Sequence, residues 1–508
     1  MDLGVLVLSI TLALSYLITL GNATKNVLFF ASDDLRPELS SYLGPNFPSP
    51  VHPPIHSPNI DTLAAKSLLL KRAYCQQAVC SPSRTSLLTG RRPDTTHVYD
   101  LGTYFRDVGG NFTTLPQYFK QNGYTTVGMG KIFHPGRASN NDDPISWSEP
   151  YFHAPNLMAW NTRESWKAVP ESEWKEKPLP DAQIADHAIE TLQRLAPAAK
   201  GSKQIPFFVA VGFHKPHLPF VFPDSMFEHY PKESIKLPDN PYAPVDMPAV
   251  AWLKYDELLR YEDIRTLNVT ADINTTLPDD VVLNLRRAYY SAVSWTDLQV
   301  GRVLDELEKL GLANNTIVSF WGDHGWQLGE HGEWTKQTNF ELGTHAPMMI
   351  HVPGLTDKGI STTELTEYVD LFPTLVEAAG LEQLPICPKN SSGIALCREG
   401  TSLMPLIETP TEPIKKASFS QFPRPSMFQI EEMGYTMRTD RYRYTEWPKF
   451  IGSPDYKPDW LTLAGVELYD HQTDPEENIN LANNPKYQTL RAQLSQQLRA
   501  GWREAQRV

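Results

Sequence analysis

Basic residues are in short supply along this chain. Its 508 residues include 46 Lys and Arg against 59 Asp and Glu, and the formal net charge is −13. This acidic balance argues against non-specific binding to nucleic acid. An anionic substrate would need basic side chains gathered locally at its site, against the field of the whole molecule.

The sequence also lacks internal repeats and low-complexity tracts. Apolar residues form 41% and charged residues 21% of the chain, as is typical of a soluble globular protein. The chain is too long for one ordinary core, so we expect a large domain of roughly 350 residues and a smaller one. The 43 prolines indicate many ordered loops between short elements.

Long apolar runs are rare, and the clearest one, residues 3–20, stands at the N-terminus. Small residues follow it up to Ala23, which predicts a secretory signal peptide over residues 1–23. The basic residues that usually precede such a run are missing, and Asp2 stands there instead. The run is just long enough to span a bilayer, but the small residues favour cleavage over a retained anchor. We therefore expect the secretory pathway and no stable membrane insertion.

Several Asn-x-Ser/Thr triplets fit this secretory route. One such triplet is common by chance, whereas several behind a signal peptide support N-glycosylation. The candidate acceptors are Asn111, Asn268, Asn274, Asn314 and Asn390.

Cysteine is scarce, with four residues in the whole chain. In an oxidising compartment they could form two disulfides. Cys387 and Cys397 flank a loop rich in Pro, Gly and Ser, and we predict a disulfide that closes it. Cys75 and Cys80 are harder to place, because they could form a second local disulfide, stay as structural thiols or belong to a reactive site.

Short apolar runs that end in polar residues predict buried strands with chemistry at their C-terminal ends. Helical patterns lie between them, over residues 57–74 and 277–311, where apolar residues follow the helical period. Strands that alternate with helices predict an α/β fold on a mixed, mostly parallel sheet flanked by helices. The four predicted strands lie within residues 26–34, 124–134, 205–217 and 316–325.

The sequence changes character after about residue 408. Beyond it, patterns of antiparallel strands precede a polar helix from about Pro485. We expect a C-terminal α+β subdomain with an antiparallel sheet over residues 409–508, packed on a first domain over residues 24–408. Ligands of parallel sheets bind beyond the carboxyl ends of the strands, where the polar clusters of the first domain fall.

Two of these clusters have the composition of a metal site. Asp33 and Asp34 directly follow a strand, and adjacent carboxylates repel unless a cation joins them. A solvated turn would explain this pair equally well. Asp323 and His324 end another strand. Three carboxylates are typical of Ca²⁺ or Mg²⁺, whereas imidazole suits transition metals better. For His331, in the loop that follows, we expect a structural role.

Two further loops after strands are rich in lysine and histidine. One contains Lys131 and His134, and the other contains His214, Lys215 and His217. Proline beside a histidine fixes the backbone and suits an oriented acid–base group. A lone histidine is usually structural, but two such loops together favour an anion site.

The segment after Cys80 predicts a helix over residues 81–90, with the cysteine at its N-terminus. Free N–H groups and the helix dipole favour an anion there and would lower the pKa of a thiol. Arg84, about one turn on, would point back to the same place. The residue types describe a site for a tetrahedral oxyanion and leave phosphoryl and sulfuryl transfer open.

The segment CSPSRTSLLTG, residues 80–90, resembles the signature of the type I sulfatase family of the alkaline phosphatase-like superfamily. The Asp-Asp pair, the Lys-His loop, the Pro-His loop and the Asp-His-Gly loop also follow in the order that this family uses. The resemblance covers nearly the whole chain behind the signal peptide. It implies an alkaline phosphatase-like catalytic domain over residues 24–408 and hydrolysis of sulfuric esters.

In this family the signature cysteine is oxidised to Cα-formylglycine, so the resemblance implies that a formylglycine-generating enzyme converts Cys80. The residues implied to bind one Ca²⁺ per chain are Asp33, Asp34, Cys80 after conversion, Asp323 and His324. Those implied to act on the sulfate, with residue 80, are Arg84, Lys131, His134, His217 and Lys336. Two positions where substrate contacts are expected are Trp326 and Asp143.

Further motifs, among them GFHKPHLPF and GEHGEWTK, resemble the branch of the family that removes the 2-O-sulfate of iduronate at the non-reducing ends of dermatan and heparan sulfate. This implies a sulfated glycosaminoglycan oligosaccharide as substrate, degraded in the lysosome or in a secreted fluid. Residues 151–181 are shorter than in that branch and lack a cysteine pair, which leaves the exact sugar open. Cys75 is an extra cysteine, interpreted as a buried thiol of the helix before the site, able to bridge to Cys80 if that residue stayed unmodified.

Three alternatives remain at this point. The chain could be a sulfatase for another sugar or for aryl sulfates. It could be a related phosphatase or phosphonate monoester hydrolase, since these share the strand-end metal site. It could also be an inactive secreted binding protein that keeps the fold, although its motifs are complete.

Overall fold

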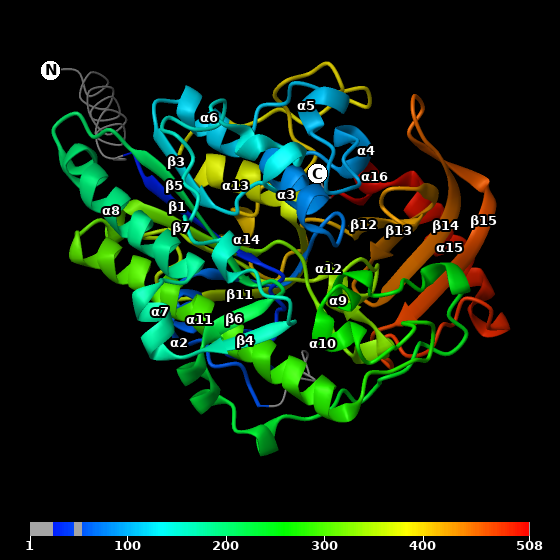
Figure 1. Ribbon diagram of the computed structural model, residues 1–508. Helices are drawn as coiled ribbons and strands as arrows, with labels where there is room; N and C mark the ends of the chain where they lie inside the picture. The colour runs from blue at the N-terminus through cyan, green and yellow to red at the C-terminus, as the bar shows by residue number, and fades with distance from the viewer. Residues whose placement is uncertain (1–23, 45–52, 507–508) are drawn as a thin grey trace, which may run out of the picture.

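The computed structural model describes residues 24–44 and 53–506, so the predicted signal peptide lies outside the described residues. The central element of the fold is a seven-stranded sheet in the order β11-β2-β10-β7-β1-β5-β3 (Figure 1). β10 runs antiparallel to both its neighbours, and the other pairs are parallel. The strands are β1 (Asn26–Asp33), β2 (Leu68–Tyr74), β3 (Thr125–Gly130), β5 (Phe207–Pro216), β7 (Thr316–Gly322), β10 (Met348–His351) and β11 (Ile360–Glu367).

β1 lies in the middle of this sheet, and its side chains alternate between two cores. Leu28 and Phe30 pack into the core under α2 (Pro58–Ala64), α8 (Pro180–Lys200) and α11 (Asp279–Lys309). Phe29 and Ala31 pack into the core under α3 (Cys80–Thr89), α6 (Leu115–Gln121) and α13 (Leu371–Ala378). Helices therefore cover both faces of the sheet (Figure 1), as the alternation of strands and helices predicts.

The predicted helix over residues 57–74 is wrong in its second half. The helix ends at Ala64, and Leu68–Tyr74 form β2 between β10 and β11. The three leucines at the start of β2 are buried at 0–6% exposure, so hydrogen bonds to two neighbouring strands override the helical spacing. Cys75 accordingly follows a strand rather than ending a helix.

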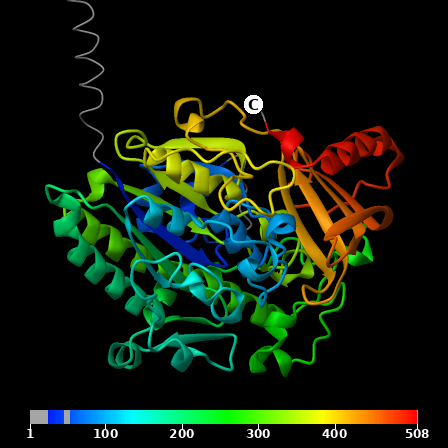
Figure 2. The ribbon, with the colours of Figure 1, turned by 90° about the horizontal axis from the view of Figure 1, so that it is seen from above.

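The C-terminal part forms a second sheet of four antiparallel strands, β12 to β15 in sequence order. A helix, α15 (Gln488–Ala500), packs against β13 and β14. Figure 2 shows this sheet and α15 together at one side of the molecule. The four strands are β12 (Ser418–Pro425), β13 (Ile430–Arg438), β14 (Tyr442–Ile451) and β15 (Lys457–Asp470).

The structure pairs Cys387 with Cys397 in a disulfide, with their Cα atoms 4.9 Å apart, and leaves Cys75 and Cys80 as buried free thiols. Within the described part of the chain, no helix is both long and apolar enough to cross a membrane. All five predicted glycosylation sites are exposed.

Candidate active site

The polar clusters predicted from the sequence meet at one edge of the central sheet. β1 lies between β5 and β7, and β3 follows β5. Because these four strands are parallel, the residues after each strand reach the same edge. Asp33–Asp34, Asp323–His324, Lys131 and His217 are brought together in this way.

Cys80 stands at the first position of α3, which ends at Gly90 in a left-handed cap with φ 64°. Its Sγ is 3.6 Å from Asp33 Oδ1, 3.6 Å from His324 Nε2 and 3.5 Å from Lys131 Nζ. Burial and the Asp33 carboxylate outweigh Lys131 and raise the pKa of the thiol well above its usual range. The expected lowering of this pKa by the helix N-terminus is therefore wrong.

Four of the predicted metal ligands form one compact set of donors. The ligand atoms of Asp34, Cys80, Asp323 and His324 all lie within 4.8 Å of one another, and all four residues are buried. His324 Nδ1 is 2.9 Å from Gly325 O, to which it can only donate. In the neutral ring the lone pair of Nε2 therefore points into the cluster, where Asp34 Oδ1 lies 3.4 Å away. Both atoms can donate an electron pair to the same ion. This is the orientation that a metal-binding histidine needs.

The charges of this set also suit a cation. Burial, together with the Asp33, Glu257 and Asp323 carboxylates, raises the pKa of Asp34 well above its usual range, although Lys336 opposes the shift. A divalent cation would relieve this crowding of carboxylates. The buried Asp, Cys and His side chains can therefore hold a metal ion.

Asp33, the fifth predicted ligand, is held by cations instead. Arg84 Nη2 donates to its Oδ1 at 2.9 Å, and Lys131 Nζ donates to its Oδ2. Although burial opposes them, Lys131 and Arg84 hold the pKa of Asp33 well below its usual range. Arg84 also donates from Nε to Asp323 at 2.9 Å, so this fully buried guanidinium braces two carboxylates of the site.

Lys336 pairs with Asp34, the carboxylate of the set that Arg84 and Lys131 do not contact. Its Nζ lies 3.0 Å from Asp34 Oδ2 and 3.1 Å from Glu257, and 4.8 Å above the ring of Trp326. Trp326 is 1% exposed and stacks on Tyr289 with their ring centres 6.4 Å apart. In this structure Trp326 therefore supports Lys336, and its role as a substrate contact stays a prediction.

Two of the predicted histidines lie within electrostatic reach of the cluster. His217 Nε2 is 3.3 Å from Glu257 and 3.8 Å from Asp34, and its side chain is 26% exposed. Burial and Lys336 lower the pKa of His217 well below its usual range. Burial and Lys131 lower the pKa of His134 to about 3, so this ring is neutral at ordinary pH.

The remaining predicted residues lie in other surroundings. Asp143 is half-buried and accepts a hydrogen bond from the backbone N–H of Tyr151 at 3.3 Å. His331 is buried with Nε2 2.6 Å from Glu476 O, in keeping with a structural role. Lys215 directs its ammonium to backbone carbonyls, so the expectation that it serves the anion site is wrong.

Sequence reasoning missed Glu257, which contacts both His217 and Lys336. It lies on the short helix α9 (Asp256–Leu259), in a stretch that reads as an ordinary polar helical turn. No strand end, glycine or histidine marks it. Only the packing of α9 over the loop that contains Lys336 brings this carboxylate to the site.

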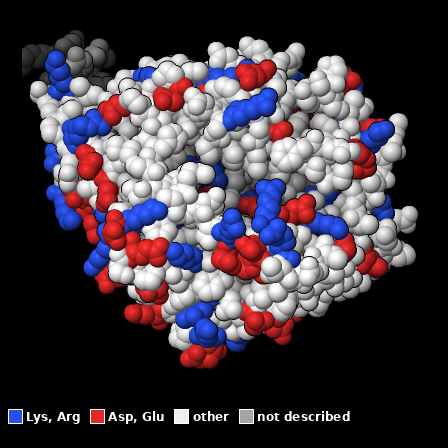
Figure 3. Space-filling model, in the orientation of Figure 1, with Lys and Arg blue, Asp and Glu red and all other residues white. Residues whose placement is uncertain are grey.

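A cavity of about 210 Å³ adjoins the cluster. Asp33, Lys131 and His217 form part of its lining, and apolar side chains such as Leu157 and Met158 form another part. Acidic and basic side chains are interspersed on the face shown in Figure 3. Attraction of an anion therefore depends on the lysines of the cluster, as the overall acidic balance predicts.

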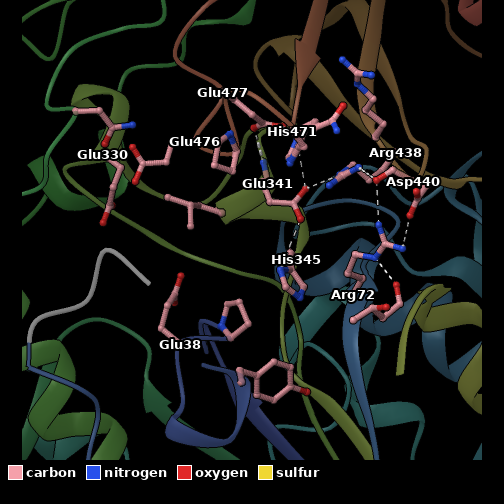
Figure 4. Close-up of a pocket in the computed structure, with 18 of the residues that line it drawn as sticks. Glu38, Arg72, Glu330, Glu341, His345, Arg438, Asp440, His471, Glu476 and Glu477 are labelled. Atoms are coloured by element: carbon pink, nitrogen blue, oxygen red, sulfur yellow. Dashed lines mark hydrogen bonds and ion pairs between the residues drawn. The ribbon is translucent and has the colours of Figure 1, made fainter. Parts of the chain in front are cut away.

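A larger cavity, of about 680 Å³, lies between residues 330–345 and the C-terminal sheet (Figure 4). Glu341, His471 and Glu477 come close enough there to suggest a second metal site. However, Arg443 donates to the carboxylates of both Glu341 and Glu477. Its guanidinium takes the place of a cation, so this cluster is an ion-pair network that joins the two parts of the chain.

Comparison with known proteins adds family matches to this geometry. The family model described as Sulfatase matches residues 25–381, and the model described as N-sulphoglucosamine sulphohydrolase, C-terminal, matches residues 329–504. The chain is 40% identical to iduronate 2-sulfatase of Mus musculus, over 91% of each protein. It is 39% identical to iduronate 2-sulfatase of Homo sapiens, over 95% of this chain and 96% of that protein.

A similar fold is found among solved structures. A protein solved in complex with its substrate D-glucosamine-2-N,6-O-disulfate superimposes with a TM-score of 0.68 at 19% identity. The match covers 94% of this chain and 97% of that one. At this identity the likeness shows a shared fold.

Proposed function

The chain belongs to the sulfatase family, and on that premise we propose that it hydrolyses the 2-O-sulfate of iduronate at the non-reducing end of dermatan and heparan sulfate. The similarity to iduronate 2-sulfatases over nearly the whole chain supports this substrate. The observation that carries the proposal is the buried set Asp34, Cys80, Asp323 and His324, placed at the start of α3. A helix N-terminus, two lysines and a metal site together suit a bound sulfate ester.

We further propose that this set, with Asp33, holds one Ca²⁺, and that a formylglycine-generating enzyme oxidises Cys80 to Cα-formylglycine. The carboxylate oxygens favour a hard cation. Together these groups would supply charge neutralisation at the sulfate and an oxygen nucleophile at residue 80.

The other side chains have distinct tasks in this proposal. Lys131 and Lys336 bind sulfate oxygens, and Arg84 keeps Asp33 and Asp323 in place. His217, whose ring is open to the cavity, protonates the leaving oxygen of the sugar. His134 is the candidate base, because its low pKa keeps it neutral and able to accept a proton.

For the cellular setting we propose a glycoprotein of the secretory pathway, lysosomal or secreted. The N-terminal apolar run and the exposed Asn-x-Ser/Thr sites support this assignment. Digestion with an endoglycosidase, followed by mass measurement, tests the glycosylation directly.

Sulfate release from defined substrates tests the function. The substrates are a disaccharide with 2-sulfated iduronate at its non-reducing end, a disaccharide with 6-sulfated glucosamine, an aryl sulfate and an aryl phosphate. We expect the highest kcat/KM on the first. Preference for the glucosamine ester would reassign the sugar, and preference for the aryl phosphate would overturn the reaction class.

Cys80→Ser tests the role of residue 80. A serine lacks the second hydroxyl that a hydrated aldehyde offers, so the variant should react at most once and then stall. Mass spectrometry of the peptide that contains residue 80 should show a covalent sulfate on the variant and formylglycine in the wild type. Sustained turnover by Cys80→Ser would contradict the scheme.

A further inference from the structure

Lys215, the second-to-last residue of β5, is a lysine for which the proposed reaction gives no task. Lys215 Nζ donates to the backbone carbonyls of His217, at 2.6 Å, and Pro219, at 2.7 Å. Both acceptors belong to the loop that presents the His217 ring to the active site. Removing an ammonium from water costs free energy unless its N–H groups find acceptors. Here the acceptors are backbone carbonyls on either side of Leu218, next to the proposed acid His217.

Lys215 is itself fixed from three other elements. The Asp181 carboxylate, on α8 and 1% exposed, accepts the backbone N–H groups of His214 at 2.8 Å and Lys215 at 3.0 Å. The carbonyl of Lys215 accepts hydrogen bonds from Ser32 on β1, at 2.9 Å, and from Thr296 on α11, at 3.1 Å. The base of the lysine side chain is therefore anchored before its ammonium reaches the loop.

The orientation of the His217 ring depends on the peptide groups that this ammonium holds. His217 Nδ1 donates to Leu218 O at 2.5 Å. Leu218 lies between the two residues whose carbonyls Lys215 binds. A hydrogen bond at one ring nitrogen sets the direction and the protonation of the other. The Nε2 atom consequently lies 3.3 Å from Glu257 and 3.8 Å from Asp34.

We propose that Lys215 is a positioning residue for His217, acting through the carbonyls on either side of Leu218, with Asp181 as its anchor. A side chain of similar length without N–H donors would leave both carbonyls unpaired and free the Leu218 peptide group to turn. The inference rests on the proposed function for the acid role of His217. The geometry of the loop is independent of that role.

A double-mutant cycle tests the coupling between the two residues. The variants are Lys215→Met, His217→Gln and the double variant, assayed on the iduronate 2-sulfate disaccharide and on an aryl sulfate. We expect Lys215→Met to lower kcat by about 10²-fold, the scale of a catalytic group misplaced by about 1 Å. In the His217→Gln background the same change should have almost no effect. A further loss of about the same size there would overturn the proposal.

Lys120 offers a matched control. Its Nζ also binds backbone carbonyls, including Pro144 O at 2.8 Å, but in a loop that does not contain His217. Lys120→Met should act additively with His217→Gln.

If Lys215→Met does not fold, Asp181→Asn replaces it, since the amide keeps one acceptor and loses the other. That variant should show the same non-additivity with a smaller loss of kcat.

A measurement without turnover separates this inference from the proposed function. The ¹⁵N shifts of the His217 ring should change in Lys215→Met because Nδ1 loses its fixed acceptor, and they should stay unchanged in Lys120→Met. Unchanged shifts in Lys215→Met would overturn the proposal. If His217→Gln kept the wild-type kcat, the acid role would fail, and the ring shifts would still decide whether Lys215 positions the ring.

Discussion

His324 and His217 are oriented by the same local device and have different tasks. Each ring donates from Nδ1 to the carbonyl of the next residue, Gly325 in one case and Leu218 in the other. Both Nε2 atoms therefore face the carboxylates of the site. The difference lies in exposure: the His324 side chain is 0% exposed, whereas His217 is 26% exposed. The sealed ring can bind an ion, and the open ring can reach a substrate.

The pKa of His217 predicts the pH dependence of the reaction. Burial and Lys336 lower this pKa well below the ordinary value of 6.5. As the acid, His217 must be protonated, and the protonated fraction falls as the pH rises through the lowered pKa. His134, with a pKa of about 3, stays neutral above that value. We therefore expect kcat/KM to rise from neutral towards acid pH.

A pH–rate profile of the wild type and of His217→Gln checks this expectation. The variant should lose most of the acid-side increase together with much of its kcat. A wild-type kcat/KM that climbs from pH 5 to pH 8 would assign the proton transfer to another group.

At the scale of elements, two glycines bring β3 and β5 close enough to place Lys131. The N–H of Lys131 donates to Gly212 O at 2.9 Å. A Cβ at Gly212 would lie 2.3–2.7 Å from backbone atoms of Lys131, and one at Gly130 would lie 2.0 Å from Gly212 O. Only glycine allows this approach, so the ends of the two strands fix the lysine.

Gly212→Ala should therefore push the Lys131 backbone out of place. We expect a loss of kcat/KM of about 10²-fold and a loss of stability of about 1–3 kcal/mol from overpacking. Gly393→Ala is the matched control, because nothing lies within 4 Å of its added Cβ. Kinetics and thermal unfolding of the two variants give the comparison, and equal effects in both would refute the argument.

At the scale of the whole molecule, ion pairs join the C-terminal sheet to the part of the chain that carries the central sheet. Arg443, on β14, donates to Glu477 and to Glu341, the first residue of the short helix α12 (Glu341–Thr344). Arg438 adds a contact to Glu341 at 3.2 Å. Figure 4 shows Arg438 and His471 directed at Glu341 from the C-terminal part of the chain.

Arg443→Met should leave the buried Glu477 carboxylate and the half-buried Glu341 carboxylate without their shared cation. Breaking such a buried pair costs about 3–5 kcal/mol, so we expect a clear fall in the unfolding temperature. Arg194→Met is the control, since Arg194 pairs with Glu149 at the surface and their side chains are 50% and 33% exposed. Calorimetry should show only a small shift for the control, and similar shifts in both would mean that the network adds little.

Metal binding should also act on the whole molecule, because an ion that binds only the folded state stabilises it. Dialysis against a chelator should lower the unfolding temperature by a few degrees, and Ca²⁺ should restore it. Asp323→Ala, which removes one donor, should respond little to either treatment. No change in the wild type would count against a bound cation in this site.

Much of the fold and the site could be predicted from the sequence, because strand ends carry a local signal. Apolar runs that stop at charged residues identified β1, β3, β5 and β7, and the parallel order of such strands brings their ends together. The family resemblance then supplied the set of metal ligands and the chemistry of residue 80. Four of those predicted ligands lie close together in the structure.

Other features depend on contacts between distant segments, and only the tertiary structure decided them. Residues 68–74 have helical spacing but form a strand, since two neighbouring strands satisfy their backbone. Glu257 reaches the site by the packing of a short helix that has no distinguishing sequence. The direction of Lys215, and the raised pKa of Cys80, follow from burial. The sequence determined which groups are present at the site, and packing determined which of them pair with one another and which stay open to a substrate.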